Sequence, residues 1–329
     1  MILIGHDSQI ASLRIAAASE RLHHAWLLTG PEGVGKGSFA RAAATRLLAD
    51  AAGPSIELPG FDVPDDHPIV RYIEAGSHPD LRILERLPRE KSEELARSIN
   101  VEQVRSLRAM FATTPGLSDR RIVIIDSIDD LERGAANALL KNLEEPPPGT
   151  IFMLVSHAPG RLLPTIRSRC RLLRFNRLSD EQMRLVLAHM LPEEERAEID
   201  ALVAAGEGSP GRALRFAGLD IASIDAAIDR LVEEGDPANA IRSALARQLA
   251  TKGAQARYEA YLDRVPGRIA TEARRRQGPE RAAALSLWEE VRRIAESAVQ
   301  LSLDPAATTF ELAGMLAKLA SADASRPVR

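Results

Sequence analysis

The chain has 329 residues, of which 45% are apolar and 27% are charged, and its formal net charge is −3 at pH 7. This length predicts two or three domains with ample core, and the acidic balance excludes a protein that attracts nucleic acid through an overall basic charge. A single cysteine excludes a disulfide framework and a cysteine-rich zinc site within one chain. No apolar run approaches the roughly 18 residues of a membrane helix, so we expect a soluble protein of the cytoplasm.

The first half of the chain alternates between short apolar runs and helical patterns. Helices are predicted over 7–22, 36–50, 101–111 (after Asn100 as cap) and 131–144, strands over 26–29, 81–84, 122–125, 151–155 and 171–175, and a loop over 53–68. This order predicts a parallel, doubly wound sheet. Ligands of such sheets bind at the carboxyl ends of the strands, and Gly30, Asp126 and Ser156 all follow such ends.

After residue 175 only helical patterns remain. Breaks between helices are expected near 206–208, 235–237, 266–267 and 278–279. We therefore predict an α/β P-loop domain over 1–175, a small helical lid domain over 176–220 and an all-α domain over 221–329. The last of these is expected to provide the contacts of an oligomer.

A glycine-rich segment follows the strand 26–29 and leads into a helix. Its candidate nucleotide-binding residues are Gly30, Gly33, Gly35, Lys36 and Ser38. Glycines let backbone N–H groups approach phosphates, and the lysine would reach the outer phosphates. Gly37 lacks the hydroxyl that normally binds Mg²⁺ at this position, and Ser38 lies about 100° further around the helix. The segment is either a weakened nucleotide site or a tight turn that binds nothing.

Asp126 ends the apolar run 122–125, where a carboxylate can hold metal-bound water, or can simply cap a loop. Ser127 follows it, although hydrolysis also needs a group that orients or deprotonates the attacking water. Such assistance is worth on the order of 10²–10⁴ in rate. Together with the weakened metal site, its loss predicts negligible ATP hydrolysis by this chain itself.

Three arginines, Arg167, Arg169 and Arg171, occur within five residues just before a predicted strand. An arginine presented to the γ-phosphate of a neighbouring subunit is worth on the order of 10³–10⁵ in rate, whereas without context this segment would be an ordinary basic loop. Ser156 is a candidate γ-phosphate sensor or a polar strand end. Arg212 could reach a nucleotide from the second domain, or lie on a helix face. The seven histidines show no metal-ligand spacing, and no metal site is predicted.

Several of these segments together resemble the AAA+ clamp-loader family of bacterial DNA polymerase III, and most closely its delta-prime class. They are residues 24–31, 78–81, 136–147 (Ala-Asn-Ala-Leu-Leu-Lys-Asn-Leu-Glu-Glu-Pro-Pro), 154–157 and 163–170, which ends in Ser-Arg-Cys. Residues 208–214 resemble the second sensor of the family.

The resemblance implies a hetero-pentamer with gamma/tau motor and delta subunits, which uses ATP to open a sliding clamp and place it on primed DNA. Within it, a delta-prime subunit is a stator with a degenerate ATP site, and its Ser-Arg-Cys arginine, here Arg169, completes the site of the adjacent motor.

Two departures from the family qualify this expectation. Relatives commonly carry a four-cysteine zinc module before the Asp-bearing strand, but this chain has no cysteine there and is expected to bind no zinc. We expect that no cofactor is required. Residual ATP or ADP binding stays open, because Gly35 and Lys36 remain. The alternatives are an active gamma/tau-type ATPase and a standalone helical DNA-binding protein.

Overall fold

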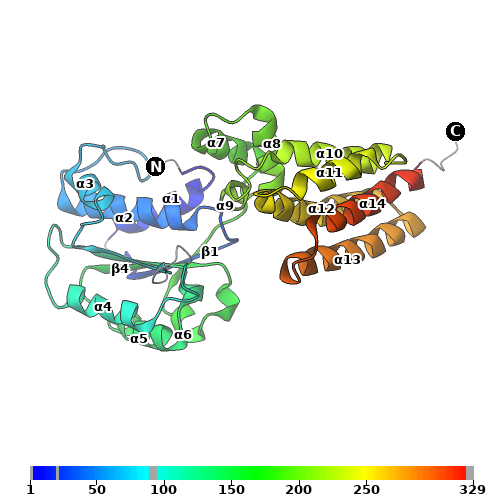
Figure 1. Ribbon diagram of the computed structural model, residues 1–329. Coiled ribbons are helices and arrows are strands. Elements are labelled where there is room, and N and C mark those ends of the chain that lie inside the picture. Colours follow the sequence, from blue (N-terminus) through cyan, green and yellow to red (C-terminus); the bar gives the residue numbers. More distant parts are fainter. Residues whose placement is uncertain (1–2, 20–21, 89–94, 324–329) are drawn as a thin grey trace. The chain divides into compact units, whose positions relative to one another are not determined.

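The computed structural model describes residues 3–19, 22–88 and 95–323. The chain divides into two compact units, residues 1–186 with 208–211 and residues 187–207 with 212–329. The first unit holds the sheet, and the second is helical (Figure 1). The finer division into three domains at residues 175 and 220 stays a prediction.

The first unit is built on a five-stranded parallel sheet with strand order β2-β3-β4-β1-β5. The strands are β1 (Ala25–Thr29), β2 (Leu81–Glu85), β3 (Arg121–Asp126), β4 (Thr150–Ser156) and β5 (Arg171–Arg174). The three central strands are buried along nearly their whole length because helices cover both faces of a parallel sheet. The sheet, the glycine loop after β1 and the helical second half confirm the predicted AAA+ P-loop fold class.

Helices form one layer on each face of this sheet (Figure 1). One layer contains α1 (Asp7–Ala18), α2 (Lys36–Ala52) and α3 (Pro68–Glu74), and the other contains α4 (Val101–Phe111), α5 (Arg133–Glu144) and α6 (Pro164–Arg167). Alternate residues of β1 belong to the two cores, Trp26 and Leu28 to one and Leu27 to the other, because side chains of a strand point to opposite faces in turn. With four residues, α6 is too short to cover β1 and β5 completely.

Local sequence signals explain where the helices of the α4–α6 layer begin and end. Asn100 Oδ1 accepts from the backbone N–H of Gln103 at 3.0 Å, and Gln103 Oε1 accepts from the N–H of Asn100 at 3.1 Å. This reciprocal capping box satisfies two donors at the start of α4. After Glu144, three prolines at 146–148 cannot continue α5. Two 3-10 turns, η1 (Ile128–Asp130) and η2 (Pro159–Arg161), follow β3 and β4.

Beyond β5 the described residues form helices and no strand. These are α7 (Asp180–Met190), α8 (Arg196–Gly206), α9 (Pro210–Leu214), α10 (Ile221–Glu234), α11 (Ala240–Leu249), α12 (Gln255–Arg275), α13 (Gly278–Gln300) and α14 (Pro305–Asp323). The predicted breaks near 206–208, 235–237 and 278–279 are confirmed. Within the described part of the chain, no helix is long and apolar enough to cross a membrane.

Three expectations about helices differ from the structure. The break predicted near Pro266 is wrong, because α12 continues through it; burial of neighbours such as Tyr261, Val265 and Ile269 offsets the roughly 3 kcal/mol that an interior proline costs. The helix predicted over 7–22 ends at Ala18, and residues 20–21 lie outside the described residues. The short α3 was not predicted, although Pro68 at its first turn is a helix-start signal.

Candidate functional site

The glycine loop between β1 and α2 has backbone angles that require glycine. Gly33 and Gly35 have φ of 73° and 100°, in the left-handed region that residues with a side chain rarely adopt. At Gly30 a Cβ would lie 2.3 Å from the carbonyl oxygen of Phe175, so any side chain would collide with the backbone. The loop therefore keeps the strand–loop–helix geometry of a phosphate-binding loop, as the sequence predicts.

Every carbonyl from residue 30 to residue 34 accepts a hydrogen bond from the chain itself. Lys36 Nζ donates to the carbonyls of Gly30 at 2.7 Å and Pro31 at 2.5 Å. The carbonyl of residue 32 accepts from Ser209 Oγ at 2.9 Å, and that of residue 33 accepts from the backbone N–H of Gly211 at 2.8 Å. The carbonyl of residue 34 accepts from His6 Nε2 at 2.7 Å. The loop is thus stabilised by its own protein and does not depend on a ligand to hold its shape.

Lys36, the residue predicted to reach the outer phosphates, is only 2% exposed. Burial lowers the pKa of its ammonium to about 8, although the nearby carboxylates of Asp126 and Asp129 favour the charged form. Two of the three N–H donors of this ammonium are engaged with loop carbonyls, so only one is left for a phosphate while those bonds hold.

Gly37 and Asp126 meet where a P-loop would bind Mg²⁺. A Cβ at Gly37 would lie 2.4 Å from Asp126 Oδ2, so the carboxylate occupies the space into which a serine or threonine would project. Burial also raises the pKa of Asp126. Ser38 is exposed on the next position of α2 and does not replace the missing hydroxyl. These residues do not fit a metal–nucleotide complex as they stand.

Ser156, the candidate sensor, is fully buried at the end of β4. Its hydroxyl donates to Asp129 Oδ1 at 2.9 Å. Asp129 Oδ2 accepts from Ser127 Oγ at 3.1 Å and from the backbone N–H of His157 at 2.5 Å. Ser156 is therefore held by a carboxylate of its own chain. Asp129 was not predicted as part of the site, although its position three residues after Asp126 brings it to the same edge of the sheet.

Arg169 follows α6 and precedes β5, so it lies at the amino end of that strand. Its guanidinium bonds Glu144 Oε1 at 2.8 Å through Nη2 and the carbonyl of Thr165 at 2.9 Å through Nη1, and its side chain is 34% exposed. Glu144, at the end of α5, was not predicted as its partner. Since β5 runs parallel to β1, Arg169 lies at the opposite edge of the sheet from the glycine loop.

Arg212 and Cys170 are each held by residues of their own surroundings. Arg212 belongs to the second unit, where it pairs with Asp263 and Glu207, each at 3.0 Å. Burial raises the pKa of the Cys170 thiol to about 12, which makes it unreactive at neutral pH. Among the described residues, no group of three or more His, Cys, Asp or Glu side chains is arranged to hold a metal ion.

Residues 5–179, more than half of the chain, match the protein family described as DNA polymerase III, delta subunit. The chain belongs to this family. It is also 37% identical over 198 residues to DNA polymerase III subunit delta' of Pseudomonas aeruginosa, with 59% of this chain and 56% of that one covered.

More distant relatives are tau-type subunits. DNA polymerase III subunit tau of Escherichia coli is 34% identical over 227 residues, which are 68% of this chain and 33% of that protein. DNA polymerase III subunit gamma/tau of Mycobacterium bovis is 31% identical over 264 residues, 70% of this chain and 42% of that one. The chain thus matches about half, or less, of the length of these relatives.

Proposed function

We propose that this chain acts as the delta-prime subunit of a DNA polymerase III clamp loader in the cytoplasm. In this role it does not hydrolyse ATP. It belongs to a hetero-pentamer with gamma/tau motor and delta subunits, which places a sliding clamp on primed DNA. Membership of the delta family and the similarity to a delta' subunit support this proposal.

The observation that carries the proposal is the separation between Arg169 and the glycine loop. Arg169 is partly exposed at the amino end of β5, whereas the glycine loop lies at the carboxyl end of β1. An extended strand rises about 3.3 Å per residue, so the four residues of β5 alone separate these two ends by roughly 13 Å. Arg169 is therefore suited to the nucleotide of a neighbouring subunit and not to its own loop.

The glycine loop supports the same function, because its residues are poorly suited to hydrolysing ATP. Lys36 is bonded to its own loop, Gly37 has no hydroxyl and the Asp126 carboxylate takes the place of one. Ser127 itself has no carboxylate with which to activate water. These features argue against the alternative of an active gamma/tau-type ATPase, and neither a nucleotide nor zinc is required for the proposed role.

We would test the proposal with the Arg169→Ala variant in a loader reconstituted from its subunits, by measuring ATPase stimulated by clamp and primed DNA. Loss of an arginine that acts on a neighbour's γ-phosphate lowers the rate of hydrolysis at that one site by a factor on the order of 10³–10⁵. Because the other sites of the complex keep their own arginines, we expect total turnover to lose the contribution of this one site and the slow site to appear in single-turnover kinetics.

The control is Arg108→Ala, which removes an exposed arginine of α4 in the same unit. It should leave turnover unchanged, and gel filtration should show intact complexes for both variants. Unaltered stimulated ATPase in the Arg169→Ala complex would refute the role in trans, and ATP turnover by the isolated chain at the rate of a motor subunit would refute the stator.

A further inference from the structure

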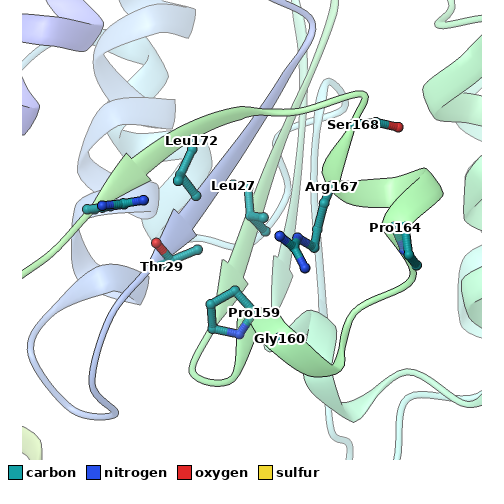
Figure 2. Close-up of a pocket in the computed structure, with 9 residues that line it drawn as sticks. Leu27, Thr29, Pro159, Gly160, Pro164, Arg167, Ser168 and Leu172 are labelled. Atoms are coloured by element: carbon teal, nitrogen blue, oxygen red, sulfur yellow. The ribbon is translucent and has the colours of Figure 1, made fainter.

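A cleft of about 640 Å³ opens on the α6 side of the sheet, over strands β1 and β5. Leu27 of β1 and Leu172 of β5 form its floor, and Pro159 of η2 and Pro164 of α6 line its sides (Figure 2). The side chain of Arg167 extends from the end of α6 into the space between them (Figure 2). This volume lies within the range of about 300–1,000 Å³ that is typical of ligand sites.

The segment that surrounds this cleft is strongly basic, although the chain as a whole is acidic. Residues 151–179 contain no aspartate or glutamate, and their arginines are Arg161, Arg167, Arg169, Arg171, Arg174 and Arg177. Two of them, Arg167 and Arg174, line the cleft. No described residue offers either of these two guanidinium groups a carboxylate or a hydrogen-bond acceptor. The cleft therefore presents two guanidinium groups that no carboxylate of the described residues pairs with.

Apolar surface lies beside these cations. Leu172 on the floor is 46% exposed, and Leu163, next to the lining residue Pro164, is 38% exposed. Exposed apolar surface rimmed by charge is typical of a binding site for another protein. None of the nine lining residues is aromatic, whereas proteins that bind single-stranded nucleic acid stack bases on aromatic side chains. The lining thus favours a peptide over a nucleic acid.

We propose that this cleft binds a short acidic peptide segment of a partner protein. One apolar side chain of the segment packs against Leu27 and Leu172, and flanking carboxylates pair with Arg167 and Arg174. Guanidinium–carboxylate pairs are geometrically specific, and opposite charges on the two surfaces steer association. Neither Lys36 nor Arg169 lines the cleft, but Ser168 does and directly precedes Arg169, so the cleft adjoins the arginine proposed to act in trans. Peptide binding by the isolated chain and the ATPase of the loader test the two proposals separately.

The test uses the full chain and a fluorescein-labelled peptide, Asp-Glu-Asp-Leu-Phe-Glu-Asp, with binding measured by fluorescence anisotropy at low salt. We expect saturable binding that weakens as salt rises, because the charges are exposed to solvent. Arg167→Glu, Arg174→Glu and Leu172→Asp should each weaken it at least about tenfold, since each replaces an attraction with a charge repulsion or removes the apolar floor.

The matched control is Arg108→Glu, which makes the same charge change on exposed α4, and it should bind as the unaltered chain does. A peptide with lysine in place of each acidic residue should not bind. Thermal unfolding checks that the three cleft variants keep their fold. We expect them to do so, because the substituted residues are exposed and lie on two separate elements. The proposal is overturned if the acidic peptide does not bind at millimolar concentration, or if the cleft variants bind it as well as the control. It is equally overturned if a single-stranded DNA oligonucleotide binds more tightly with the same dependence on Arg167 and Arg174.

Discussion

At residue 37, a side chain and the carboxylate of Asp126 compete for the same space. The contact distance of 2.4 Å between a Cβ at Gly37 and Asp126 Oδ2 is too short for both groups to stay in place. A serine introduced at position 37 would therefore displace Asp126 before it could bind a metal. Restoring a hydroxyl at position 37 therefore also requires the Asp126 side chain to move.

This competition predicts a measurable coupling between positions 37 and 126. Gly37→Ala should gain about 1 kcal/mol of helix propensity in α2, but in the unaltered chain the contact with Asp126 should cancel that gain. In an Asp126→Ala background the same change should stabilise the protein by about 1 kcal/mol. Urea unfolding of the four proteins measures the cycle, and equal effects of Gly37→Ala in both backgrounds would contradict the contact.

The buried lysine of the loop predicts a dependence of stability on pH. The pKa of Lys36 is about 8 in the folded chain and about 10.4 when unfolded. Between these values the unfolded chain binds more protons, so the contribution of this group to the free energy of unfolding rises with pH. The cost of burying the charged lysine is present below pH 8 and is relieved above it.

Urea unfolding at about pH 7.5 and about pH 10, with Lys36→Met as the comparison, checks this dependence. The unaltered chain should gain on the order of 1 kcal/mol more than the methionine variant between the two pH values. An identical change with pH in both proteins would mean that Lys36 is not the titrating group.

At the scale of single elements, the start of α4 depends on one side chain. Asn100→Ala removes the acceptor for the N–H of Gln103 and is expected to cost about 1 kcal/mol of stability. Asn137→Ala, an exposed position inside α5, is the matched control and should be neutral or slightly stabilising because alanine has the higher helix propensity. Chemical denaturation compares the two, and equal effects would show that the cap does not contribute.

The strands could be predicted from the sequence because each is a short apolar run next to a turn signal. Ile122–Ile125 and Ile151–Val155 are buried on both faces, so their runs are continuous. Pro266 could not be assigned in this way. Its helix propensity indicates a break, and only the packing of α12 decides that the helix continues.

On the scale of the whole molecule, net charge conceals where the charge lies. The chain carries 43 basic and 46 acidic residues. Residues 151–179 around α6 and β5, however, contain arginines and no aspartate or glutamate. A global excess of acid excludes an overall attraction to polyanions. It does not exclude a local basic surface, because exposed charges further apart than about 10 Å are largely screened from one another by salt.

By itself, the sequence determined the fold class and the position of the glycine loop. It also determined that position 37 lacks a hydroxyl and that position 127 lacks a carboxylate base. These depend on local patterns and on the chemical nature of single residues. The tertiary structure alone decided what the remaining groups contact. Lys36 bonds its own loop, Asp126 fills the space at Gly37, Asp129 holds Ser156 and Glu144 holds Arg169. Such contacts join residues from different elements, and their geometry is set only when the sheet and its helices pack together.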